Sequence, residues 1–125
     1  MPNSYTADDL NELAAAIDAF AASLPVGAPG QEGLDATTWA GILGGTASNL
    51  RLMAVRDYLA EAAEPMKNVI AATRDAQHAA ATLRNFARTV ELAGDVALLA
   101  SIIWLQKWNL VVPTLKELRK DATAP

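Results

Sequence analysis

The feature that most constrains this chain is a long apolar stretch, Ala93 to Val112. Its only charged residues are Asp95 near the start and Lys107 near the end. On a helical wheel at about 100° per residue, its apolar side chains point in all directions rather than along one stripe. A helix that is apolar all round is buried in a protein core or lies in a membrane. The stretch therefore predicts a central apolar helix over about residues 95–112.

Local chemistry predicts where this helix begins and ends. The Asp95 carboxylate can accept hydrogen bonds from the free amides of a first helical turn, so we expect Asp95 to act as the N-cap. Gly94, just before it, suits the C-terminal cap of the preceding helix. Pro113 disfavours helical geometry at Val112, so the central helix should stop or kink there.

Two environments for the central helix remain open. The first is the core of a soluble helical bundle. The second is a membrane, because about 20 apolar residues can span a bilayer. The polar residues Asp95, Gln106, Lys107 and Asn109 count against a resident span, and we favour the bundle.

The composition predicts one domain with apolar surface to cover. The chain has 125 residues, which fits a single domain over residues 1–125. Its hydrophobic fraction is 52% and its mean hydropathy is +0.15, whereas an average soluble domain is about 45–50% apolar with glycine included. Some apolar residues should therefore lie outside and form a self-association face or a partner surface. The net charge of −4 argues against nonspecific nucleic-acid binding.

The absence of cysteine limits the possible chemistry, and the first residues of the chain indicate its cellular compartment. The chain has no cysteine, which excludes disulfides, thiolate catalysis and cysteine-based zinc sites. The polar, acidic start of the chain is unlike a secretory signal, so we expect a cytoplasmic protein, with export by a leaderless route left open.

The N-terminal half predicts two helices separated by a loop. Residues 1–5 form a tail, and Thr6 followed by acidic residues predicts a helix over about 7–24. Two prolines and three glycines predict a loop over 25–34. Asp35 then resembles an N-cap for a helix that reaches about Ala63. Whether this helix passes through Gly44 and Gly45 stays open, because two glycines cost about 2 kcal/mol relative to alanine.

The C-terminal half predicts a long helix, the central helix and a short final one. Pro65 marks either a new helix start or a kink. From Met66 to Gly94, small and apolar residues recur at alternating spacings of four and three, which is typical of a close helix–helix seam. We predict a last helix over residues 114–120 and a tail over 121–125. No segment has the pattern of a strand. We predict an all-α bundle of four to five helices around the central apolar helix, either as a single chain or as a dimer.

No residue set predicts catalysis, a metal or a cofactor. His78 is the only histidine, and its position off the apolar seam favours a solvated side chain. Asp57, Glu61 and Glu64 stand at helical spacings, which is typical of a solvated face. The glycines near Gly44 lack the lysine and the preceding strand that a phosphate-binding loop needs. We therefore expect no metal site and no cofactor, and we favour a non-enzymatic protein over an enzyme.

Several residues are candidates for an interface or a ligand pocket. Trp104 and Trp108 share one face of the expected central helix, and with a methionine nearby they could line a pocket for a small apolar ligand. Arg84 and Arg88 are one helical turn apart and could bind an acidic partner. The full set of candidates is Trp104, Trp108, Trp39, Met53, Met66, Arg84 and Arg88.

The sequence leads to one main functional hypothesis and two alternatives. The main one is a non-enzymatic helical module that binds itself, another protein, or both, because apolar content is high and no catalytic set is recognisable. The first alternative is a membrane-active, pore-forming type of protein whose central helix is released between Gly94 and Pro113. The second is a binder of a small apolar ligand that uses Trp104 and Trp108.

Overall fold

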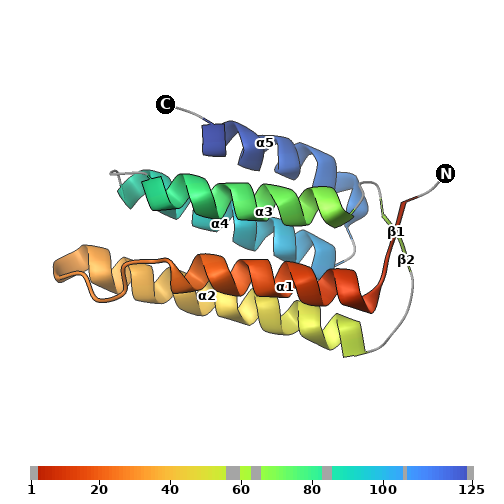
Figure 1. The fold of residues 1–125 in the computed structure, drawn as a ribbon, viewed down its shortest axis with the longest axis horizontal. Helices are drawn as coiled ribbons and strands as arrows, with labels where there is room; N and C mark the ends of the chain where they lie inside the picture. Colours follow the sequence, from red (N-terminus) through yellow and green to blue (C-terminus); the bar gives the residue numbers. More distant parts are fainter. Residues whose placement is uncertain (1–2, 56–59, 63–65, 83–85, 106, 124–125) are drawn as a thin grey trace.

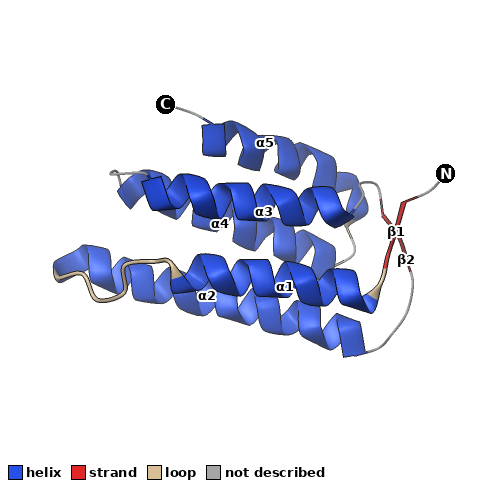
Figure 2. Cartoon of the chain, viewed as in Figure 1, coloured by secondary structure: helices blue, strands red, loops and turns tan. Residues whose placement is uncertain are grey.

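The fold is an all-α helical bundle. The structure, a computed structural model, describes residues 3–55, 60–62, 66–82, 86–105 and 107–123. Within these residues the chain forms five α-helices and one 3-10 turn (Figures 1 and 2). They are α1 (Ala7–Ala22), α2 (Gly30–Val55), α3 (Met66–Thr82), α4 (Phe86–Trp104), η1 (Trp108–Leu110) and α5 (Val111–Thr123).

The five helices surround a single apolar core. Helix α1 packs against α2 and α3, α4 packs against α2 and α5, and α3 also contacts α5 (Figure 1). Side chains from every helix join the core, among them Phe20, Leu43, Ile70, Ile103 and Leu115. The ring of neighbours leaves each helix with one side toward the core and one side toward solvent.

The start of α1 confirms the predicted cap. The Thr6 hydroxyl accepts from the Asp9 amide at 3.3 Å, and the Asp9 carboxylate accepts from the Thr6 amide at 3.0 Å. This reciprocal capping box satisfies two amides that a helix start leaves unpaired. Helix α1 ends at Ala22, slightly before the predicted end, while Leu24 remains buried in the core.

Helix α2 corrects two expectations. It begins at Gly30, so the predicted loop over 25–34 is too long and Asp35 is not the N-cap. It then runs without a break through Gly44 and Gly45. Burial of Leu43, Ala47 and Leu50 on its inner side offsets the helix-forming cost of the glycines.

The turn into α2 depends on two glycines. Gly30 has a φ of 73°, a left-handed conformation that only glycine adopts at little cost. A Cβ on Gly33 would lie 1.9 Å from the backbone oxygen of Ala28. The loop backbone therefore lies directly against the first turns of α2, where no side chain fits.

Helices α3 and α4 replace the single long helix predicted from Met66 to Gly94. Residues 83–85 lie outside the described part of the chain, and α4 begins at Phe86. Gly94 and Asp95 lie inside α4, so neither caps a helix. A Cβ on Gly94 would stand 3.5 Å from Cη2 of Trp39. The indole of Trp39 in α2 therefore lies over Gly94 of α4, at a distance where an alanine Cβ would make an ordinary van der Waals contact.

The predicted central helix over 95–112 is also wrong in its extent and its burial. Helix α4 ends at Trp104, and the chain passes through η1 into α5. Leu98 is 54% exposed and Leu105 is 58% exposed, so the stretch has a side that faces solvent. Pro113 does not end a helix but lies in the first turn of α5, where its missing amide leaves no hydrogen bond unmade. Helix α5 then extends to Thr123, into the predicted tail.

A short β-pair was not predicted. Strands β1 (Asn3–Tyr5) and β2 (Ala60–Ala62) pair antiparallel, with Asn3 opposite Ala62 and Tyr5 opposite Ala60. The pair joins the segment before α1 to the connection between α2 and α3 (Figure 1). Three-residue strands are too short to show an alternating pattern in sequence.

Candidate interaction surface

One side of α2 exposes a row of uncharged residues to solvent. The row, which we call the α2 outer face, consists of exposed residues at helical spacings of four and three: Leu34, Thr38, Gly41, Gly45, Ser48 and Leu52. On a helical wheel it lies opposite the fully buried Leu43 and Leu50. Leu34 is 64% exposed and Leu52 is 55% exposed. The exposed Ile42 lies beside the row.

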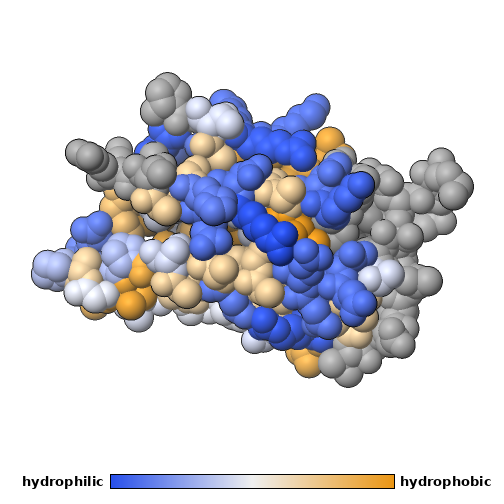
Figure 3. Space-filling view, in the orientation of Figure 1, coloured by the Kyte–Doolittle hydropathy of each residue, from blue (hydrophilic) through white to orange (hydrophobic). Residues whose placement is uncertain are grey.

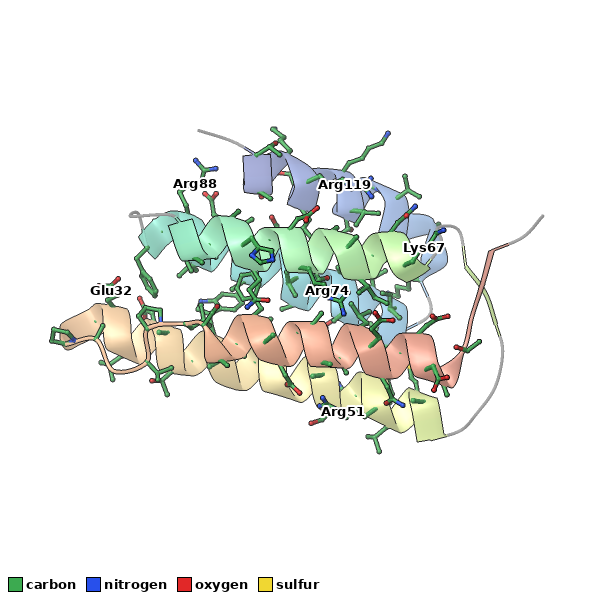
Figure 4. The ribbon with its side chains drawn as sticks, viewed as in Figure 1. Glu32, Arg51, Lys67, Arg74, Arg88 and Arg119 are labelled. Carbon is green, nitrogen blue, oxygen red and sulfur yellow. The ribbon has the colours of Figure 1, made fainter. Side chains whose placement is uncertain are left out.

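The α2 outer face contains no charged side chain. Residues 36–50 include no aspartate, glutamate, lysine, arginine or histidine. At the two ends, the charged residues of α2 pair elsewhere: Asp35 accepts from Gln31 at 2.8 Å, and Arg51 pairs with Asp18 of α1 (Figure 4). A solvent-exposed helix face normally carries charged and polar residues. The α2 outer face differs from such faces because it carries no charge over about four helical turns.

The face that α1 and α3 form offers a direct contrast. Hydrophilic side chains dominate it (Figure 3). Arg74 of α3 lies 3.1 Å from Glu12 of α1, and both side chains remain about half exposed (Figure 4). Such surface ion pairs contribute about 0–1 kcal/mol to stability. They do mark α1 and α3 as a face that remains in water.

The glycines in the middle of α2 pack against no other part of the chain that the structure describes. A Cβ added at Gly41, Gly44 or Gly45 would meet no atom within 4 Å. Glycine inside a helix costs about 1 kcal/mol relative to alanine. No contact among the described residues requires a glycine rather than an alanine at these three positions. Close approach by another molecule would explain them.

Two threonine hydroxyl groups on or beside the face already have hydrogen-bond partners. Thr37 donates to the Gly33 carbonyl at 2.9 Å, and Thr38 donates to the Leu34 carbonyl at 3.0 Å. A polar group that loses water without a hydrogen bond is costly to bury. Because these two donors keep their partners inside α2, covering the face with another protein leaves neither donor unpaired.

The structure separates the tryptophans and methionines that the sequence grouped together. Trp104 ends α4 and packs half-buried against the core, whereas Trp108 lies in η1, so the two do not share a helix. Trp39 is half-buried between α2 and α4. Met53 is 2% exposed and belongs to the core. The side chains of Trp108, Met66 and Arg84 lie outside the described part of the structure.

A cavity among the described residues lies away from the tryptophans. Its volume is about 270 Å³, and it opens where the loop after α1 meets the start of α4. Its lining residues are Ser23, Pro25, Glu32, Ala80, Ala81, Phe86 and Thr89. Neither Trp104 nor Trp39 lines it. Because the side chain of Trp108 is not described, the predicted pocket between Trp104 and Trp108 stays a prediction.

A group of carboxylates gathers where α4 meets α5. Arg88 donates to the Asp121 carbonyl at 3.1 Å, and its Nε lies 3.4 Å from Glu91. Oδ2 of Asp95 is buried without a donor in reach among the described residues, and its neighbour is the Asp121 carboxylate. Two carboxylates can share a hydrogen bond only when one of them carries a proton. Burial first, then Asp121, Glu117 and Glu91, raise the pKa of Asp95 to about 7.

The raised pKa of Asp95 predicts a pH-dependent stability. The folded pKa of about 7 exceeds the ordinary aspartate value of 3.8, so the folded state holds the proton more tightly. This contribution is complete below about pH 4 and is lost as pH rises toward about 7. Asp95→Asn keeps a donor toward Asp121 and removes the titration. Because the side chain is partly exposed, we expect the variant to gain only about 1 kcal/mol over wild type at pH 8 and nothing near pH 4.

Urea denaturation at the two pH values measures this difference. Asp75→Asn is the matched control, because Asp75 is exposed on α3 and the chemical change is identical. An Asp95→Asn variant that loses stability with pH as steeply as wild type would show that Asp95 is ionised throughout.

Sequence reasoning missed the α2 outer face. The available signal was the run of fifteen residues, 36–50, without a charge. Its orientation depended on whether the helix continues through Gly44 and Gly45, which the sequence left open. Among the described residues, no group of three or more acidic or histidine side chains is arranged to hold a metal ion. In the same part of the chain, no helix has both the length and the apolar character to cross a bilayer.

Comparison with protein-family models, with curated proteins and with solved structures returned no significant match for this chain.

Proposed function

We propose that this chain is a non-enzymatic protein–protein interaction module that self-associates through the α2 outer face. The observation that carries the proposal is an exposed, uncharged helix face on a chain with a net charge of −4. Charged residues are placed on the other helices and at the ends of α2, where they pair or face water. Exposed leucines on a helix face without charge are a feature of interaction sites in soluble proteins.

The residue types of the face also suit a contact between helices. Leu34 and Leu52 supply apolar area near the two ends, and Gly41 and Gly45 provide a shallow middle where another backbone can come close. Burial of apolar area contributes about 25 cal/mol per Å². Since no charge must be dehydrated, most of this gain is kept on association.

Analytical ultracentrifugation over a wide concentration range tests the proposal. We expect the wild-type chain to shift from monomer toward dimer as concentration rises. Leu52→Glu should raise the dimer Kd about 100-fold or more, because a carboxylate buried without a partner costs several kcal/mol. Leu105→Glu is the matched control: Leu105 is 58% exposed, lies after α4 and gives the same net charge. It should dimerise like wild type.

Three outcomes would overturn the proposal. The first is a wild-type chain that stays monomeric at every concentration. The second is equal weakening by Leu52→Glu and Leu105→Glu, which would place the contact away from α2. The third is unchanged association of Leu52→Glu. Circular dichroism of each variant establishes that the helices are intact before association is compared.

A further inference from the structure

We infer that the partner on the α2 outer face is α2 of a second copy, running antiparallel about a two-fold axis at the level of Leu43. This inference rests on the proposed function and adds the occupant and its orientation. It starts from an arrangement of residues along the face that is symmetric in both position and type.

The order of residue types along the face is the same whether it is followed from Leu43 toward the N-terminus or toward the C-terminus of α2. Leu34 and Leu52 each lie nine residues from it. Thr38 and Ser48, both small hydroxyl residues, each lie five residues from it, and Gly41 and Gly45 each lie two residues from it. An antiparallel copy would therefore place leucine against leucine, hydroxyl against hydroxyl and glycine against glycine.

This pattern matches what two-fold symmetry requires. In a two-fold dimer, if residue i of one copy contacts residue j of the other, residue j also contacts residue i. A parallel arrangement would pair each residue with itself. An antiparallel arrangement instead pairs positions at equal distances on either side of Leu43, which have the same residue type. It also sets the two helix dipoles in opposite directions.

The glycines determine where the two helices come closest. A Cβ at Gly41 or Gly45 would meet nothing within 4 Å in the chain itself, so the surface is open at this point. Interaxial distances of packed helices depend on the side chains at the contact. Glycines on both sides of the axis permit a close crossing, and the leucines farther out cover the two ends of the contact.

Charge and area are compatible with a second copy and set the strength of the contact. Each chain carries a net charge of −4, so a face that brings no carboxylates together favours association of identical copies, and the α2 outer face is such a face. Helix α2 has 26 residues and is about 39 Å long and about 10 Å wide, which gives about 400 Å² per copy. The total of about 800 Å² is below the roughly 1,200 Å² of stable complexes, so the dimer should be weak and reversible.

Single-cysteine variants test the orientation, because the chain has no cysteine of its own. In the antiparallel dimer, position 38 of one copy faces position 48 of the other. Mild oxidation of mixed Thr38→Cys and Ser48→Cys chains should give more covalent dimer than oxidation of either variant alone. Two copies of position 38 would lie about 15 Å apart along the axis, whereas a disulfide needs Cα atoms within about 7 Å.

A control mixture measures random collision. Ala15→Cys and Ala19→Cys place exposed cysteines on α1, outside the proposed contact, and should give only background cross-linking. Stronger cross-linking of Thr38→Cys alone than of the mixture would show a parallel pair and overturn the inference. Cross-linking of the 38 and 48 mixture at the control level would place the contact elsewhere and overturn it too.

Different results would contradict the proposed self-association and the inferred antiparallel α2 contact. If the wild-type chain sediments as a dimer but the cysteine mixture gives only background, the antiparallel α2 contact is wrong while self-association stands. If wild type remains monomeric in the ultracentrifuge, both are wrong. Both cysteine replacements are small and exposed, and circular dichroism will show whether the helical bundle is retained.

Discussion

Replacing Leu99 with alanine should lower the free energy of unfolding by about 2–5 kcal/mol, whereas the same change at Leu98 should lower it by less than about 0.5 kcal/mol. The two leucines are neighbours in α4, so helix propensity and backbone are nearly the same for both. Leu99 is 1% exposed and Leu98 is 54% exposed. Only the first replacement removes a side chain from the core and leaves a cavity.

Chemical denaturation followed by circular dichroism measures both values, at a protein concentration where sedimentation shows monomer. The comparison tests whether the long apolar stretch has a side in water. Equal and large losses at both positions would mean that Leu98 is buried too, as a helix apolar on all sides would require. Equal and small losses would mean that α4 is not part of a packed core.

Replacing Gly33 with alanine should destabilise the fold by about 3 kcal/mol, while replacing Gly44 with alanine should stabilise it by about 1 kcal/mol. Both glycines lie in α2, and alanine is the better helix former at each. A Cβ at Gly33 would lie 1.9 Å from the Ala28 oxygen, and a Cβ at Gly44 would meet no atom within 4 Å. Steric conflict with the loop backbone therefore reverses the sign at Gly33.

Thermal and urea denaturation of the two variants, compared with wild type, show whether each replacement stabilises or destabilises the fold. Gly44 lies to one side of the α2 outer face, so its replacement reports on folding more than on association. A stabilised Gly33→Ala chain would show that the loop over residues 25–29 does not pack on α2. A destabilised Gly44→Ala chain would show that α2 is interrupted at its glycines, as one sequence-based alternative allowed.

How much of this fold the sequence predicted depends on how local each signal is. The start of α1 was predicted correctly because its capping box lies within four residues, Thr6 to Asp9. The helical bundle itself followed from the spacing of apolar residues along α1 and α3. The start of α2 was missed because prolines and glycines dominate its composition, while the burial of Ala36 that stabilises its first turns is a tertiary effect.

Gly94 shows why the boundaries in the C-terminal half could not be predicted. In sequence, a glycine that caps a helix and a glycine inside a helix beside a neighbouring ring look the same. The ring belongs to Trp39, which is distant in sequence and contacts Gly94 only after α2 and α4 have packed. Once Gly94 is placed inside a helix, Asp95 becomes a half-buried carboxyl beside Asp121 of α5 instead of an N-cap.

The candidate surface was predictable in part. High apolar content indicated that some apolar surface remains outside, and Leu34, Ile42 and Leu52 are indeed exposed in the isolated chain. Which residues form one face depended on the phase of α2 across Gly44 and Gly45. Only a continuous helix places Leu34 and Leu52 on the same side.

The uncharged outer face of α2 has a consequence for how ionic strength acts on assembly. Added salt shields the like charges of two approaching chains, each with a net charge of −4, and removes nothing from a contact that contains no ion pairs. A dimer formed through this face would thus tighten as salt is raised, the reverse of a complex held by salt bridges. Dilute buffers would therefore conceal it, and concentrated ones would favour its detection.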